Sequence, residues 1–121
     1  MAWEVEYTDD FHAWWDGLTV AEQAQVDAYV RRLELRGPDL SFPHSRKING
    51  SRHNHMRELR VQSHGDPNRV FYAFDPTRSA ILLIGGAKAG NDRFYEAMIP
   101  LADRLYDEHI AELKAEERLK K

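Results

Sequence analysis

The sequence contains no cysteine, which excludes a disulfide framework, thiolate chemistry and a zinc–thiolate site. Long apolar runs are also missing. The longest one, Ala80–Ala87, is far too short to span a bilayer and suits a buried strand. The first six residues have neither the basic patch nor the apolar stretch of a targeting segment. We therefore expect a protein of the reducing cytoplasm with no membrane partner.

Neither charge sign is in large excess, since the net charge is −3, yet the distribution is uneven. Residues 1–35 carry a net charge of −6, residues 36–93 carry +5 and four histidines, and residues 94–121 carry −2. Backbone phosphates are held mainly by lysine and arginine, so a local basic segment matters more than the total. The pattern favours nucleic-acid binding by the middle of the chain, with the acidic N-terminal residues left for packing or partner binding. Chance segregation of charge between helices and a sheet is the alternative.

The length of 121 residues, with 42% apolar and 31% charged residues, predicts one ordered domain covering the whole chain. Alternation over residues 3–7 predicts a strand. Residues 8–9 then offer a cap for a short helix that ends near Gly17. A capping box at residues 19–22 begins a second helix, and Gly37-Pro38 stops it. These two segments read as a helical hairpin.

The next part of the chain, residues 38–55, shows no regular pattern and carries several basic residues and histidines. Three strand patterns follow at residues 57–62, 69–74 and 80–84, with a turn predicted at residues 64–68. Short connections between successive strands predict an antiparallel meander. Helices packed on one face of such a sheet make an α+β domain, and we expect the central basic residues on the other face and its rim.

The last third of the sequence returns to helical character. Gly85-Gly86 is expected to end the last strand, and a helix is expected to begin near Asn91-Asp92. Pro100 suits the first turn of a second helical segment, so this region is predicted as two helices.

Five motifs follow one another between residues 56 and 110: Met56-Arg57-Glu58-Leu59-Arg60, Arg69–Asp75, Ile81–Lys88, Phe94-Tyr95 and Ile99–Asp103. In this order and spacing they resemble the RelE/ParE toxin superfamily, and most of all its HigB-like, phage-derived branch. The N-terminal strand and helical hairpin match in order and length, so the resemblance covers nearly the whole chain. It implies a RelE-like, microbial-RNase-like fold.

The resemblance also implies an activity and partners. The chain is expected to be the toxin of a type II toxin–antitoxin system, a ribosome-dependent endoribonuclease that cleaves mRNA without a metal or other cofactor. Its partners would be the ribosome, mRNA and a cognate antitoxin, often a helix-turn-helix protein. Arg69 matches the family's phosphate-binding arginine, and Arg60 matches another frequent arginine. Lys88 falls at the lysine after the last strand, and Tyr95 at a tyrosine that orients the substrate.

Some positions depart from the RelE-type pattern. The basic residue that follows the lysine is Ala89 here, and the lysines of the first meander strand correspond to Met56 and Glu58. Ala87 stands where close relatives have an acidic residue. These departures leave the general acid and base open, and a constellation that uses loop histidines is an alternative.

Cleavage of RNA without a metal needs a base for the 2′-hydroxyl proton, positive charge around the phosphorane and an acid for the leaving 5′-oxygen. Arginine grips phosphate with its planar fork, and an aromatic ring can stack on a base. Whether Arg60 and Arg69 share a face depends on a strand register that the sequence leaves open. No metal site is predicted, because the His-x-His at residues 53–55 lacks a third ligand. The candidates for RNA binding around the catalytic set are Arg46, Lys47, Arg52, His53, His55, Arg57 and Arg93.

Two other functions remain compatible with the resemblance. The superfamily includes gyrase poisons of the ParE type, and the chain could instead be a catalytically degenerate module kept for antitoxin binding. The basic central segment and the Lys88/Tyr95 pair favour the ribonuclease.

Overall fold

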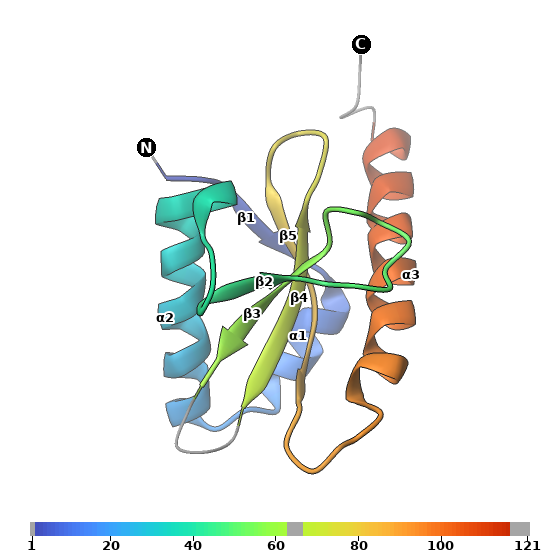
Figure 1. Cartoon of the computed structure of the whole chain (residues 1–121). Coiled ribbons are helices and arrows are strands. Elements are labelled where there is room, and N and C mark those ends of the chain that lie inside the picture. The colour runs from blue at the N-terminus through green and yellow to red at the C-terminus, as the bar shows by residue number, and fades with distance from the viewer. Residues whose placement is uncertain (1, 63–66, 117–121) are drawn as a thin grey trace.

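A computed structural model describes residues 2–62 and 67–116 of the chain (Figure 1). The predicted turn at residues 64–68 therefore lies mostly outside the described residues. The elements in chain order are β1 (Val5–Tyr7), α1 (Asp9–Asp16), α2 (Val20–Arg36), a 3-10 turn η1 (Gly37–Asp39), β2 (Ser45–Lys47), β3 (Arg57–Val61), β4 (Asn68–Phe74), β5 (Ala80–Ala87) and α3 (Phe94–Ala115). Within the described residues, no helix has the length and apolar character that a membrane crossing requires.

The strands form one five-stranded sheet in the order β1-β5-β4-β3-β2. The predicted antiparallel meander is present as β3, β4 and β5. Two further strands extend it: β2 pairs antiparallel with β3, and β1 pairs parallel with β5. In the β3–β4 pair, Arg60 lies opposite Arg69, so these two side chains project from the same face.

The helices cover both faces of the sheet, which corrects the expectation that they pack on one. The hairpin of α1 and α2 lies on one face, and α3 lies on the other (Figure 1). Each face has its own apolar core. Leu59, Val70 and Tyr72 belong to the core under α1 and α2, whereas Phe71 and Ile81 belong to the core under α3. Because successive residues of a strand point to opposite faces, each central strand contributes to both cores.

The two N-terminal helices begin where the sequence predicts. The Thr8 hydroxyl accepts a hydrogen bond from the Phe11 amide at 2.9 Å and caps α1. The capping box of α2 is complete: Thr19 Oγ1 accepts from the Glu22 amide at 3.1 Å, and the Glu22 carboxylate accepts from the Thr19 amide at 2.9 Å.

Two predictions about the strands are wrong. The segment 38–55, predicted to be irregular, contains β2, and β5 continues through Gly85-Gly86 to Ala87. A Cβ at Gly85 would lie 2.3 Å from the Trp14 ring of α1, and one at Gly86 would lie 3.0 Å from Phe94 of α3. These glycines therefore allow helices to pack closely on both faces, and they do not end the strand.

The C-terminal region is one helix, and Pro100 lies inside it. Proline has no amide to offer to the carbonyl of Glu96 four residues earlier. Both residues lie on the exposed side of α3, where water can satisfy that carbonyl. The helix therefore continues through the position that was expected to divide it.

Candidate functional site: a cationic cluster around a buried glutamate

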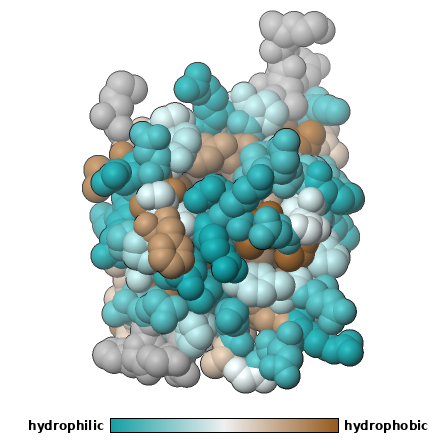
Figure 2. All heavy atoms as spheres, in the orientation of Figure 1, coloured by the Kyte–Doolittle hydropathy of each residue, from teal (hydrophilic) through white to brown (hydrophobic). Residues whose placement is uncertain are grey.

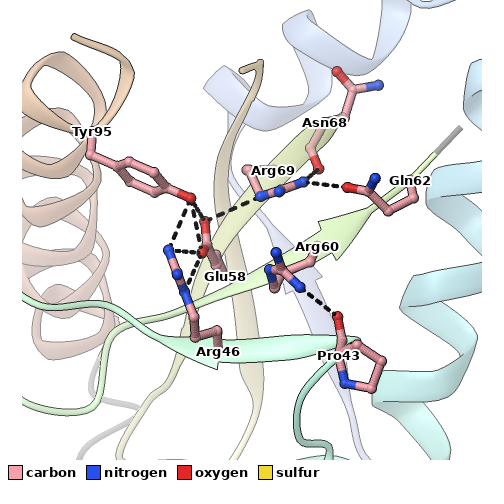
Figure 3. Close-up of polar contacts among 8 residues, drawn as sticks. All are labelled: Pro43, Arg46, Glu58, Arg60, Gln62, Asn68, Arg69 and Tyr95. Carbon is pink, nitrogen blue, oxygen red and sulfur yellow. Dashed lines mark hydrogen bonds and ion pairs between the residues drawn. The ribbon is translucent and has the colours of Figure 1, made fainter. Parts of the chain in front are cut away.

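The side chain of Glu58 is fully buried in the face of the sheet that α3 covers. Arg46 contacts its Oε2 with both Nε, at 3.0 Å, and Nη2, at 2.9 Å. The Tyr95 hydroxyl lies 2.8 Å from Oε1 and 3.0 Å from Oε2. The Nε of Arg69 is 3.8 Å from Oε1, so it is an ion-pair neighbour without a hydrogen bond. Figure 3 shows these side chains converging from β2, β3, β4 and α3.

Strand register explains why these residues meet. Arg46 lies opposite Glu58 in the β2–β3 pair, and Arg60 lies opposite Arg69 in the β3–β4 pair. Glu58 and Arg60 are two residues apart on β3, so they share a face. The first turn of α3 then places Tyr95 over this part of the sheet, and Lys88 Nζ lies 5.9 Å from the centre of its ring.

The cluster carries four cationic side chains and one carboxylate, an excess of positive charge. The Arg69 side chain is 5% exposed, and it donates from Nη1 to Gln62 and to the Asn68 carbonyl. The Nε groups of Arg69 and Arg60 are buried and have no hydrogen-bond partner among the described residues. A buried donor without a hydrogen bond is costly, so these two arginines leave part of the donor capacity of the cluster unused.

Tyr95 stays protonated at neutral pH. Its burial raises the pKa of the hydroxyl, and so does the hydrogen bond to Glu58, while the guanidinium groups of Arg69 and Arg46 act in the opposite direction. The tyrosine is therefore a hydrogen-bond donor in the cluster. Arg46 adds a second donor to it, from Nη2 to the hydroxyl oxygen at 3.2 Å.

An exposed aromatic ring borders the cluster. Phe42 is 67% exposed, and the Arg60 guanidinium lies 4.9 Å from the centre of its ring. Arg60 also donates from Nη1 to the Pro43 carbonyl at 3.3 Å. The face of the molecule that is turned toward the viewer, with β2 in front, is mostly hydrophilic and has small apolar patches (Figure 2). An exposed ring beside an arginine is a surface on which a nucleobase can stack.

The structure brings together the four residues expected to be catalytic and one of those expected to bind RNA. Arg60 lies opposite Arg69. Arg69 and Tyr95 contact Glu58, as Arg46 does, and Lys88 lies beside the Tyr95 ring. Arg57 and Lys47 project to the opposite face, where Arg57 donates to the Ser45 hydroxyl at 2.9 Å. Arg93 precedes α3 and is exposed beside Glu96, at 3.6 Å.

The loop histidines lie elsewhere. His53 is 3.0 Å from Asp107, which Arg52 also contacts, and His55 is 3.1 Å from the Tyr106 hydroxyl. Residues 106 and 107 lie about 17 to 18 Å further along α3 than Tyr95, at 1.5 Å per residue. Burial, with the neighbouring His53, lowers the pKa of His55. These histidines fasten the loop to α3, and in this structure they do not reach Glu58.

Sequence reasoning missed the central position of Glu58. It was read as a departure from a lysine pattern, although its spacing from Arg60 places both on one face once β3 is recognised. Among the described residues, no group of three histidine, aspartate or glutamate side chains could hold a metal ion.

This fold is shared with RelE-type toxins. The isolated RelE toxin of Escherichia coli superposes with a TM-score of 0.60 at 15% identity, over 80% of this chain and 96% of that one. RelE from the archaeal RelE–RelB complex of Pyrococcus horikoshii gives 0.57 at 14% identity, over 75% of this chain and 100% of that one. At such identities the likeness establishes the α+β fold.

The family is shown by sequence. Residues 13–107 match the model of the phage-derived Gp49-like proteins, and the chain belongs to this family. It is 40% identical over 104 residues to toxin HigB2 of Mycobacterium tuberculosis, covering 84% of this chain and 52% of that protein. Toxin HigB3 of the same organism is 41% identical over 99 residues, covering 81% and 85%. The chain thus spans about half the length of HigB2. The predicted resemblance to HigB-like toxins is confirmed.

Proposed function

We propose that this HigB-like chain is the toxin of a toxin–antitoxin pair and a ribosome-dependent endoribonuclease that cleaves mRNA without a metal. The observation that carries the proposal is the convergence of Arg46, Arg60, Arg69 and Lys88 around the Glu58–Tyr95 pair. A ribose–phosphate link presents a negative phosphate beside a hydroxyl, and this cluster offers surplus cations beside a carboxylate.

The arginines would hold the scissile phosphate. The Arg69 guanidinium is fixed by Gln62 and the Asn68 carbonyl, so its orientation is set before substrate arrives. Donors fixed in advance stabilise the charge of a pentacoordinate phosphorane without further reorganisation. The exposed ring of Phe42 beside Arg60 would support an adjacent base.

Glu58 is the group best placed to take the proton of the 2′-hydroxyl. The attacking 2′-oxygen would form a bond to phosphorus as the bond to the 5′-oxygen breaks, leaving a 2′,3′-cyclic phosphate and a 5′-hydroxyl. Two side chains can donate the proton to the leaving oxygen, Lys88 and Tyr95. Arg46 is 48% exposed, so its guanidinium can turn from Glu58 toward the incoming phosphate as the hydroxyl enters.

The partner in this proposal is a cognate antitoxin. The structures that share this fold include an intact RelBE toxin–antitoxin complex from E. coli and the archaeal RelE–RelB complex. An antitoxin with a helix-turn-helix domain, bound to this chain in the cytoplasm, would complete the pair. A short neighbouring reading frame that encodes such a protein is the expected genetic context.

The test is expression with mapping of mRNA ends in translating cells and in purified translation extracts. Wild type should arrest growth and cut ribosome-bound mRNA. Lys88→Ala and Arg69→Ala should lower cleavage about 10²- to 10³-fold, the usual cost of removing one donor to a developing charge. Arg31→Ala is the matched control, because that arginine is exposed on α2 and should leave cleavage unchanged.

Other outcomes would decide against the proposal. Full toxicity in both site variants would remove the cluster from the mechanism. Growth arrest with intact mRNA and a DNA-damage response would identify a gyrase poison instead. A wild-type chain that binds an antitoxin but never slows growth would be a degenerate binding module. Circular dichroism should accompany Arg69→Ala because that side chain is buried, whereas Lys88 is partly exposed.

A further inference from the structure

The edge of the sheet opposite the cationic cluster is formed by β1. Val5 lies opposite Ala80 and Tyr7 opposite Leu82 in the parallel pair with β5. The bonds that flank these positions run from the Ala80 amide to the Glu4 carbonyl, 2.9 Å, and from the Thr8 amide to the Leu82 carbonyl, 3.1 Å. In a parallel pair, alternate residues of a strand make the hydrogen bonds to its neighbour. Here the residues that flank Val5 and Tyr7 bond to β5, so Val5 and Tyr7 direct their own N–H and C=O groups to the open edge.

A largely apolar hollow lies beside this edge on the face of α1 and α2. It measures about 320 Å³, and its lining includes the apolar Val5, Phe11, Trp15, Val30 and Leu82 together with His12, Asp27 and Glu34. The Tyr7 ring, 59% exposed, forms part of the same lining. Apolar side chains that enter this hollow would be removed from water, at about 25 cal/mol for each Å² of apolar area buried.

An acidic hollow lies beside the same edge on the face of α3. It measures about 210 Å³ and is lined by residues of β1, of the first turn of α1 and of α3. None of the described residues that line it is lysine or arginine, and His109 there is bonded to Asp75. Arg104 pairs with one carboxylate, Glu108. The carboxylates of the lining are Glu6, Asp9, Asp10, Glu108 and Glu112.

Together the edge and the two hollows specify an occupant. A strand added to β1 would point alternate side chains to the two faces, one set toward the apolar hollow and the other toward the acidic one. We propose that β1 is the docking edge for an extended segment of a protein partner in which apolar residues alternate with lysine or arginine. The charge of −6 on residues 1–35 matches this pattern.

The place of this surface separates it from the cleavage site. The cationic cluster lies over β2, β3 and β4, and β5 stands between it and β1. The docking proposal therefore stands on the edge itself. Identification of the partner as the antitoxin rests on the proposed function.

The probe is a heptapeptide of alternating valine and lysine, added to the isotope-labelled full chain and followed by NMR. We expect shifts and slowed hydrogen exchange at the amides of Val5 and Tyr7. A peptide with glutamate in place of lysine should bind at least tenfold more weakly. The double variant Asp9→Asn with Asp10→Asn should weaken the lysine peptide several-fold, and Glu96→Gln, exposed on another part of α3, is the matched control.

Alternate N-methylation tests the backbone contact. In one docked direction, the amides of one alternate set of peptide residues face β1 and those of the other set face solvent. We expect methylation of one set to abolish binding and methylation of the other to preserve it. Binding by both methylated peptides, binding by neither, equal binding of the glutamate peptide, or occupation of the edge by a second copy of this chain would overturn the proposal.

The outcome separates two claims. No RNA or ribosome enters the peptide experiment, so failure of docking beside normal mRNA cleavage would overturn only the docking edge. If the peptide binds to β1 but the chain never cleaves mRNA, the docking proposal would stand and the proposed function would be overturned.

Discussion

Two buried carboxylates lie at different places in the same sheet, and their surroundings differ. Asp75, at the turn between β4 and β5, accepts hydrogen bonds from the Thr77 amide at 2.9 Å, the Thr77 hydroxyl at 2.7 Å and the Ser79 amide at 3.1 Å. His109 of α3 completes the set at 2.7 Å. Glu58 has Arg46 and Tyr95 as direct partners, and two arginines near it keep Nε donors without partners.

On the proposed function, the difference separates a carboxylate that holds the fold together from one that would take part in the reaction. Asp75 is saturated by donors, and the contact with His109 fastens α3 to the sheet. Around Glu58 the cations outnumber the carboxylate, which is unfavourable in a closed core and favourable where an anion will bind. Burial alone therefore does not distinguish these two carboxylates, whereas the balance of donors and acceptors around each of them does.

The largest expected effect comes from Glu58→Gln. The amide keeps the shape and can still accept from Tyr95, but it cannot take a proton, so mRNA cleavage should fall about 10²- to 10⁴-fold. Binding of anions should strengthen at the same time, because the cluster loses its only carboxylate. Cleavage rates and the rise in melting temperature with added inorganic phosphate measure the two effects.

In Glu58→Gln, cleavage should fall while phosphate binding rises, and misfolding cannot produce both changes. A variant that merely unfolds would lose cleavage and phosphate stabilisation together. Cleavage close to that of wild type would show that Glu58 is not the base and would reduce it to an anchor for Arg46 and Tyr95.

The change Asp75→Asn should act on stability. It removes the charge from four hydrogen bonds in a side chain with no exposure, and we expect a loss of about 2 kcal/mol in the free energy of unfolding. Cleavage per folded molecule should be unchanged. Urea unfolding followed by circular dichroism measures the loss, and a matching fall in specific activity would contradict the structural role.

The pH dependence of that loss is set by the aspartate. Burial alone would raise the pKa of Asp75, but the hydrogen bonds from His109, Thr77 and Ser79 outweigh it and hold the pKa below its usual value. A lowered pKa stabilises the folded state above the unfolded value of about 3.9 and loses this effect as the pH falls through the folded value. The stability difference between wild type and Asp75→Asn should therefore be full at pH 6 and shrink below about pH 4.

The same contrast shows what sequence could reveal. The capping box of α2 joins Thr19 to Glu22, three residues apart, so its whole geometry is local and the prediction was correct. The strand β1 was predicted from its local alternation, but its parallel pairing, with Val5 opposite Ala80, joins distant segments and no local pattern encodes it. The strand β2 was missed for the same reason, because its hydrogen bonds depend on β3.

The sequence indicated which residues belong to the candidate site, but it did not indicate how they are arranged. The basic character of Arg60, Arg69 and Lys88 was visible, but the sharing of a face by the two arginines required the β3–β4 register. The position of Glu58 beside Arg69 and Tyr95 required both that register and the position of α3, which was expected as two helices. In the sequence, Glu58 was interpreted as the replacement of a lysine. In the structure it lies at the centre of the cationic cluster.

The smallest expected effect compares two neighbours on β2. Arg46 faces Glu58, whereas Lys47 lies opposite Arg57 and faces the side of α2. Arg46→Ala should lower cleavage about 10²-fold, because it removes a donor that touches the reacting groups. Lys47→Ala should lower it only about twofold, through a screened attraction for RNA worth less than about 1 kcal/mol, and 0.3 M salt should erase that loss. Single-turnover cleavage at two salt concentrations tests both variants. Equal losses would mean that RNA contacts both faces of β2, and the functional surface would then extend around the edge of the sheet to Arg57.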